Sequence, residues 1–280
     1  MQKKIYYHFL VIFILFISAY PPAIYADSID NLYDAAISDA RIAKPDEISR
    51  SLVGISSPDN KNIPTVLQWK EIYGENHVLV CSWVGTYISN KGWGEGQTYT
   101  LGSTDNLWIT VSPQLKTFFS SNEFWPDSHA EIILRIEQLL GLPKDNGKVK
   151  FIEFWVKPSD LFRPSPDPDP SDHEAQLEYP WKKSRFQIQE ISQKIHEYVS
   201  SKDPNHEYTF KEWFENLNAT SYSGSTPYPW TKLGYTYDWA EDIHNNGHVG
   251  LSEFLVLGGA TIIIEQTVDT DNLEDYFVQP

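Results

Sequence analysis

The sequence predicts an α+β fold, with a mainly antiparallel sheet and several packed helices in a single domain. Helical and strand-like periodicities are interspersed along the chain without strict β–α–β alternation, which argues against a parallel sheet. Two apolar runs near the end, 249–257 and 260–268, are joined by Gly258-Gly259, a dipeptide that suits the primed turn of a hairpin. We find no internal repeat, and the length fits one large domain.

The first 26 residues are typical of a secretory signal peptide. Lys3 and Lys4 precede the apolar run 9–17, and a short tail ends at Ala26. The apolar run is far shorter than the roughly 20 residues that a membrane-spanning helix needs, and no later segment approaches that length. We therefore expect cleavage near Ala26, a periplasmic or secreted protein, and no integral membrane segment in the mature chain.

The mature chain, 27–280, is expected to form one acidic domain of 254 residues. The whole sequence has a net charge of −16, and loss of a leader with two lysines and no acidic residue makes it −18. Such a surface repels phosphate groups, so we expect no nucleic-acid partner. A small molecule, a cation, a neutral glycan or a basic protein remains a reasonable ligand. Excess acid also simply keeps an exported protein soluble.

Cys81 is the only cysteine, so no disulfide can form within the chain and the fold depends on packing. A eukaryotic secreted chain of this size more often has paired cysteines, which favours a bacterial source. The surrounding run 78–83 offers neither a helix start nor a cationic neighbour to lower the pKa of the thiol. We therefore interpret Cys81 as a buried, inert thiol.

The first half of the mature chain predicts one helix and three strands. Ser28 can cap a helix whose apolar side chains recur at helical spacing, and Pro45 marks its limit. Residues 77–88 are rich in β-branched and aromatic side chains and predict a long, mostly buried strand. Residues 97–101 and 107–111 predict a hairpin.

The middle of the chain contains a helix start, a strand and a proline-rich loop. Ser128 with Glu131 forms a capping box that predicts a helix. Residues 148–157 predict a central strand, because both of its faces are largely apolar. The Pro/Asp-rich loop 164–174 excludes regular structure, since its alternating prolines remove backbone donors, and we expect it to be an extended acidic linker.

Two more helices are expected before the final strands. Thr209 with Glu212 forms a second capping box. The other helix precedes it, with an apolar face formed by Ile188, Ile191, Ile195 and Tyr198. Together with the interspersed strands, these helices complete the α+β pattern.

The segment 235–248 concentrates the most chemistry. Asp242, His244 and His248 lie close together on an expected loop, and imidazole with carboxylate suits a divalent transition metal. The turn-forming run 245–247 departs from the known helical zinc pattern. Two alternatives stay open here: a divalent metal ion as cofactor, or solvated loop histidines.

Three acidic side chains are candidate catalytic groups. Glu153 and Glu253 lie on otherwise apolar strands, where burial raises the pKa of a carboxyl group as a general acid requires. Asp238 belongs to the histidine-containing segment. Two carboxylates facing one cleft would suit hydrolysis of a glycosidic bond. The alternative is that each of the two glutamates lies at a strand end or pairs with an arginine such as Arg135 or Arg163.

Ten tryptophans among 280 residues are a high content, and four aromatic residues on loops are candidate ligand-binding residues. Trp93 lies between glycines, and Tyr228 and Trp230 lie in a segment rich in glycine and proline. Trp239 follows in the histidine-containing segment. Exposed aromatic side chains on such loops often carry recognition. Packing back over the core is the competing interpretation.

Four runs of the sequence carry a resemblance: Arg135–Pro143, Phe154–Pro164, Pro229–Trp239 and Val249–Phe254. They are similar to runs in a family of exported bacterial proteins of unassigned function, and the similarity covers most of the mature chain, from about residue 60 to residue 268. The resemblance implies export and a bacterial source. It implies no activity, and it supplies no catalytic residues.

Two functional hypotheses follow. The first is an exported, noncatalytic binding protein of the bacterial envelope or exterior, with a glycan or a peptide as ligand. The second is a carboxylate-dependent hydrolase, with or without a metal. The sequence shows no combination of nucleophile, base and oxyanion donor, which favours the first. Whether the candidate residues line one pocket discriminates between the two.

Overall fold

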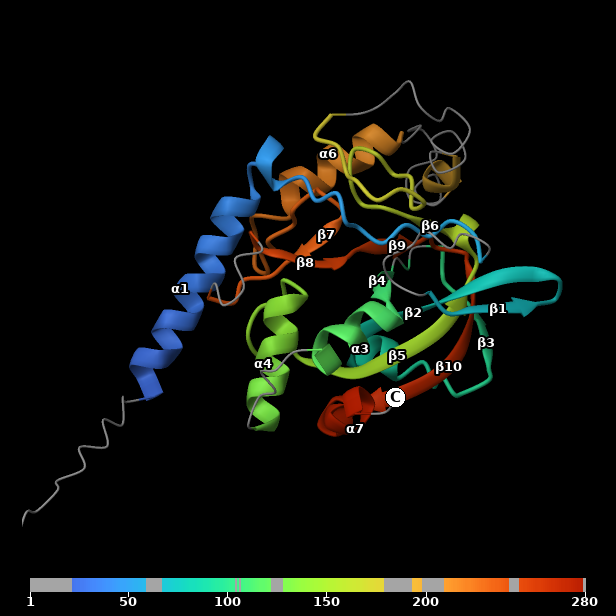
Figure 1. Cartoon of the computed structure of the whole chain (residues 1–280), viewed down its shortest axis with the longest axis horizontal. Helices are drawn as coiled ribbons and strands as arrows, with labels where there is room; N and C mark the ends of the chain where they lie inside the picture. Colours follow the sequence, from blue (N-terminus) through green and yellow to red (C-terminus); the bar gives the residue numbers. More distant parts are fainter. Residues whose placement is uncertain are drawn as a thin grey trace, which may run out of the picture.

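The computed structural model describes residues 22–58, 67–103, 105, 107–121, 128–178, 193–197, 209–241 and 247–278. It has the expected α+β class, with helices packed around a curved sheet (Figure 1). The helices are α1 (Pro22–Ala40), α2 (Thr86–Ser89), α3 (Ser112–Ser121), α4 (His129–Leu139), α6 (Phe210–Thr220) and α7 (Leu273–Val278). The strands are β1 (Trp69–Ile72), β2 (Glu75–Gly85), β3 (Thr98–Thr100), β4 (Leu107–Val111), β5 (Lys148–Val156), β6 (Leu161–Phe162), β7 (Tyr235–Tyr237), β8 (Val249–Ser252), β9 (Phe254–Val256) and β10 (Thr261–Asp269).

The main sheet has eight strands in the order β3-β10-β5-β2-β4-β9-β6, and β1 pairs with the first half of β2. All of its pairs are antiparallel. β5 lies between β2 and β10, which confirms the central strand predicted over 148–157. A separate pair, β7 with β8, brackets the segment that contains the histidines.

The sheet curls strongly, and neither of the two predicted hairpins forms. Three strands separate β9 from β10, yet only residues 257–260 connect them. Four strand spacings in a flat sheet would be about 19 Å, whereas such a connection spans at most roughly 17 Å. β9 pairs with β4 and β6, and β10 pairs with β5 and β3. The predicted hairpin of 97–101 with 107–111 is also wrong, because β3 pairs with β10 and β4 pairs with β2 and β9.

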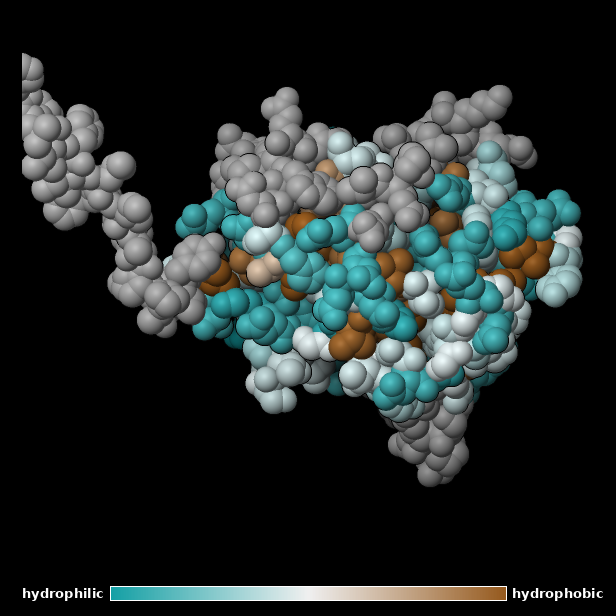
Figure 2. Space-filling view, turned by 90° about the horizontal axis from the view of Figure 1, so that it is seen from below, coloured by the Kyte–Doolittle hydropathy of each residue, from teal (hydrophilic) through white to brown (hydrophobic). Residues whose placement is uncertain are grey.

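Alternation along the strands gives the sheet two apolar faces. The inner face is filled by one cluster, whose members include Val80, Ile109, Phe154, Phe254 and Ile262. The outer face carries Trp83 and Phe151, which pack against buried side chains of α3, α4 and α7. Figure 1 shows these three helices together beside β5 and β10. In the view of Figure 2, hydrophobic residues appear only as small patches among hydrophilic ones.

Both capping boxes are confirmed, while other boundaries differ from the prediction. Ser128 with Glu131 caps α4, and Thr209 with Glu212 caps α6. α1 begins at Pro22 rather than at Ser28, which agrees with the preference of proline for the first position of a helix.

Three other elements were assigned wrongly or missed. The strand predicted over 77–88 ends at Gly85, where α2 begins. The sequence did not predict α3 or α7, whose folding depends on the outer face of the sheet. Of the helix predicted around Ile195, the structure describes 193–197 as helical, and Ile195 is buried there; its other apolar positions lie outside the described residues.

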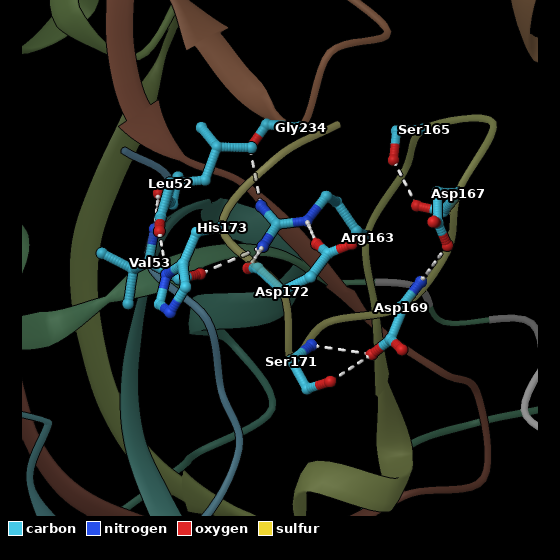
Figure 3. A network of polar contacts seen from close by, with 11 residues as sticks. Leu52, Val53, Arg163, Ser165, Asp167, Asp169, Ser171, Asp172, His173 and Gly234 are labelled. Carbon is cyan, nitrogen blue, oxygen red and sulfur yellow. Dashed lines mark hydrogen bonds and ion pairs between the residues drawn. The ribbon is translucent and has the colours of Figure 1, made fainter. Parts of the chain in front are cut away.

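The Pro/Asp-rich loop 164–174 is irregular, as predicted, but it is not a solvated linker. Its first half is largely buried, and it follows Arg163, whose side chain is fully buried. The Arg163 guanidinium donates hydrogen bonds to the carbonyl oxygens of Gly234 (3.1 Å), Val53 (3.0 Å) and Asp172 (3.1 Å) (Figure 3). Burial lowers the pKa of Arg163 to about 10, so the guanidinium remains charged at neutral pH. One cation therefore joins three distant segments.

Substituting Arg163 should unfold the protein far more readily than substituting an exposed arginine. Arg163→Met leaves three carbonyl groups without their donor and should lower the free energy of unfolding by about 3–5 kcal/mol. Arg50→Met is the control, because Arg50 pairs with Glu174 at 3.5 Å on an exposed surface and should contribute less than about 1 kcal/mol. Urea denaturation of both variants measures this, and equal losses would contradict the structural role of Arg163.

Candidate functional site

A cavity of about 590 Å³ lies against the outer face of the sheet. Residues of β2, β4 and β5 line it, together with residues at the ends of α4 and α6 and with Tyr228, Thr236 and Glu253. This volume is within the range of small-molecule pockets in proteins. Of the sequence-predicted site residues, the cavity brings together two: the candidate acid Glu253 and the candidate ligand-binding Tyr228.

Aromatic rings form much of the cavity wall. Trp83 stacks on Phe151 with ring centres 5.3 Å apart. Trp108 meets Tyr228 edge to face at 5.9 Å. Tyr87, whose side chain is 73% exposed, marks a part of the cavity that reaches the surface. The wall thus presents apolar ring faces to any occupant, and rings of this kind contribute large contact areas.

Glu253 lies at the junction of β8 and β9 and is 3% exposed. The hydroxyl of Tyr228 donates a hydrogen bond of 2.7 Å to its Oε1 atom. Its Oε2 atom is buried and has no hydrogen-bond partner among the described residues. Burial raises the pKa of Glu253 from 4.5 to about 7, against the lowering effect of the Tyr228 hydrogen bond. This carboxyl group therefore changes its protonation near neutral pH.

Thr110, another residue of the cavity lining, has a second unsatisfied polar atom. Its Oγ1 atom is buried, and within the described part of the chain nothing forms a hydrogen bond with it. β4 pairs with β9 so that Ile109 lies opposite Phe254. Continuing that register by one residue places Thr110 beside Glu253, on the face opposite the inner apolar cluster. The two unsatisfied oxygens therefore belong to neighbouring positions of one wall.

Lys148 is the cationic residue of the cavity lining. It is half-buried at the start of β5, and burial lowers the pKa of its amine. None of the described carboxylates lies within ion-pair distance of its Nζ atom, whereas Lys150 on the same strand pairs with Asp269 at 3.1 Å. The cavity thus contains an acid and a base that are not paired with each other.

Glu153 does not line this cavity. It is buried under α3 and α7, where Ser112 and Gln266 donate to its carboxylate, Tyr276 donates at 2.8 Å, and Lys116 lies at 3.3 Å. These partners account for its burial without an arginine. Cys81, opposite Glu153 on β2, is buried, and its pKa is raised by burial and then by Glu153, in keeping with an inert thiol.

Asp238 and His248 also lie outside the cavity lining. Asp238 forms a bidentate ion pair with Arg135, with distances of 2.9 and 2.6 Å. The Nδ1 atom of His248 lies 2.8 Å from the Asp238 carbonyl oxygen, and the imidazole stacks on Tyr237. His248 lines a second cavity, of about 420 Å³. The candidate carboxylates and histidine are therefore distributed over separate environments.

The predicted metal site is described only in part. Asp242 and His244 lie outside the described residues, so their relation to His248 stays a prediction. Within the ranges that the structure covers, no group of three His, Cys, Asp or Glu side chains could hold a metal ion.

Three of the four aromatic candidates are buried. Trp93 belongs to the inner cluster and contacts Tyr99, and Trp230 and Trp239 belong to a cluster beneath α1 and α6. Their exposed fractions of 7%, 1% and 2% correct the expectation of surface platforms. Their glycine- and proline-rich context does not determine exposure, because a loop can fold its ring onto the core. Tyr228 alone of the four lines the cavity.

Sequence reasoning missed most of the cavity wall, including Trp83, Trp108, Thr110 and Lys148. One signal was available: alternation in 107–111 places Trp108 and Thr110 opposite the apolar side chains of the same strand. The sequence alone does not show which helix ends cover that face of the sheet. It therefore does not predict that a cavity remains between the helices and the sheet.

Comparisons with known proteins identify no relative. A scan against protein-family models found no match, and searches of curated proteins and of solved structures also found none. The similarity to a family of exported bacterial proteins stays a prediction, and the site is interpreted from its own geometry.

Glu253 should make stability depend on pH. Its pKa is higher in the folded protein than in the unfolded chain, so its stabilising contribution is complete below about pH 4.5 and is lost as the pH rises to about 7. Across this window the wild type should lose about 2–3 kcal/mol relative to Glu253→Gln, which has no proton to release. Denaturation with urea at several pH values measures the difference.

The matched control is Glu265→Gln, since Glu265 lies on β10 with a side chain that is 42% exposed. This variant should follow the wild-type pH profile. Parallel profiles for the wild type and Glu253→Gln would show that burial does not raise the pKa of Glu253.

Proposed function

We propose that this chain is an exported binding protein of the bacterial envelope or exterior, and that a small ligand occupies the cavity beside Glu253. The supporting observation is the pair of unsatisfied oxygens, Glu253 Oε2 and Thr110 Oγ1, on one wall of that cavity. A buried polar atom without a partner costs roughly 1–3 kcal/mol. A ligand that hydrogen-bonds to both atoms would recover this free energy on binding.

Binding accounts for the cavity better than the alternative of carboxylate-dependent hydrolysis. The usual glycosidase arrangement needs two carboxyl groups across the scissile bond. The cavity lining contains a second carboxylate, that of Asp105, but Asp105 forms an ion pair with Lys91. Glu153 and Asp238 have protein partners elsewhere. These contacts favour a role for Glu253 in recognition.

Ligand binding can be tested by thermal-shift measurements with glycans, short peptides and divalent ions. At a concentration of about 100 times Kd, a ligand should raise the melting temperature by about 5 °C or more. Thr110→Phe, which fills the cavity from within, should abolish this shift. Thr98→Phe, at an exposed position of β3, should retain it. If no compound raises the melting temperature, or if Thr110→Phe responds like the wild type, the proposal fails.

Export is the second part of the proposal. The leader and the resemblance to exported bacterial proteins support it. None of the described helices has the length and apolar character that crossing a bilayer requires.

Expression of the full chain in a bacterium should give a product in the periplasm or the medium that begins near Asp27. Intact-mass measurement of each fraction identifies the start of the chain. Lys3→Glu with Lys4→Glu should retain the precursor in the cytosol, because the leader needs its positive charge. A cytosolic wild-type product with Met1 or Gln2 at its start would contradict export.

A further inference from the structure

We propose that the ligand of the cavity is a short peptide of two or three residues with free termini, whose ammonium group binds Glu253 and whose carboxylate binds Lys148. This inference rests on the binding function proposed above and names the chemical class of its ligand. Its basis is the placement of Glu253 and Lys148, which are not paired with each other, in the lining of a single cavity with aromatic walls. The second acidic residue of that lining, Asp105, forms an ion pair with Lys91.

The end of the cavity at Glu253 suits an ammonium group. Glu253 Oε2 and Thr110 Oγ1 are both buried, and neither has a hydrogen-bond partner in the described ranges. An ammonium group has three N–H donors and no acceptor, so it can satisfy both oxygens at once when the two side chains turn toward the cavity. The Tyr228 hydroxyl already occupies Oε1, which fixes the orientation of the carboxylate. A charge-assisted hydrogen bond of this kind is roughly twice as strong as a neutral one.

The other end of the cavity suits a carboxylate. Lys148 lies opposite Gly85 in the pairing of β5 with β2, and it has no ion-pair partner among the carboxylates that the structure describes. Partial burial of its amine lowers the pKa of Lys148. A carboxylate placed there would supply the missing counter-charge. A neutral glycan would leave Lys148 without a counter-charge, which is unfavourable in a partly buried site.

The separation of the two ends indicates the length of the ligand. Thr110 lies opposite Cys81 of β2, and Lys148 lies opposite Gly85 of the same strand. The two residues are therefore four positions apart along β2. At a strand rise of about 3.3 Å per residue this is about 13 Å along the strands. Across the strands, β5 and β9 are three spacings apart, which is about 14 Å in a flat sheet and less in this curled one. The side chains of Lys148 and Glu253 and the two ion-pair contacts span part of this separation. A single amino acid covers roughly 3.5 Å of extended chain, and two or three residues cover roughly 7–11 Å. The geometry therefore favours a di- or tripeptide.

Aromatic walls between the two ends would accommodate the side chains of such a peptide. Trp83 and Trp108 belong to adjacent strands of the sheet, and Phe151 stacks on Trp83. These rings offer contacts that tolerate many apolar side chains, because ring faces have no directional hydrogen bonds. The charged termini would then determine orientation, and the walls would add affinity with little sequence preference.

The test uses the tripeptides Ala-Phe-Ala and Ala-Leu-Ala in four forms: with free termini, N-acetylated, C-amidated, and capped at both ends. Isothermal titration calorimetry with the folded mature protein should show binding of the free forms. Each single cap should weaken binding at least about tenfold, since it removes one charge-assisted contact. Free phenylalanine should bind more weakly than the tripeptide, because it cannot reach both ends.

Two variants assign each terminus to its residue. Lys148→Met should remove the preference for a free carboxylate and keep the preference for a free ammonium group. Glu253→Gln should do the reverse. Lys150→Met and Glu265→Gln are the matched controls on β5 and β10, and both should keep both preferences. Circular dichroism and the melting temperature establish that each variant is folded.

Several outcomes would overturn the inference. Equal affinity for free and capped tripeptides would show that the termini are not recognised, and preferences that survive both substitutions would show that other residues recognise them. If the free tripeptides do not bind while chitotriose binds the wild type and not Thr110→Phe, the ligand is a glycan; the peptide inference then fails and the proposed binding function stands. If no compound binds the folded protein, both proposals fail.

Discussion

The buried guanidinium of Arg163 holds in place the part of the fold on which the candidate site depends. Its hydrogen bonds to Gly234, Val53 and Asp172 connect three segments that are distant in sequence. The Gly234 carbonyl oxygen also accepts a hydrogen bond of 2.9 Å from the backbone N–H of Glu253. Arg163 and Glu253 therefore share one acceptor, and the position of the cavity carboxyl group depends on the cation.

A second connection joins the same two regions. The backbone N–H of Val53 donates a hydrogen bond of 2.8 Å to the Ser252 hydroxyl, next to Glu253. Gly234 must be glycine, because its φ is +73° and a Cβ atom there would lie 2.4 Å from Arg163 Cδ. The junction between β8 and β9 is thus held from two sides by groups that leave little room for movement. This rigidity suits a recognition site, since a preorganised group loses less entropy on binding.

The sequence predicts those features that local chemistry determines. The capping boxes at Ser128 and Thr209 begin helices because a side-chain oxygen satisfies a free backbone N–H wherever the helix lies. The run 148–157 is predicted as central because both faces are apolar, and β5 is central. Strand pairing depends instead on the curl of the whole sheet, which a dipeptide such as Gly258-Gly259 does not encode, and so both hairpins were predicted wrongly.

Part of the candidate site was predictable from the local sequence as well. A glutamate within an apolar strand is unusual at any position, so Glu153 and Glu253 were both identified, but the sequence could not distinguish the partners that each one meets. Glu153 has four polar partners, including Tyr276 from the last helix, whereas Glu253 has one side-chain partner and an unsatisfied oxygen among the described residues. That difference arises from tertiary contacts far along the chain.

The contrast between these two glutamates explains why we place only one of them in the candidate site. The Glu153 carboxylate has polar partners from the protein and is part of the packing under α3 and α7. A ligand would have to displace these protein donors to reach it. Incomplete satisfaction at Glu253 and Thr110 destabilises the unliganded fold, and proteins commonly keep such unfavourable groups where a binding partner offsets them. The rigid frame around Arg163 maintains this arrangement, because a flexible junction would let Glu253 turn toward solvent and lose the unsatisfied oxygen that a ligand can bind.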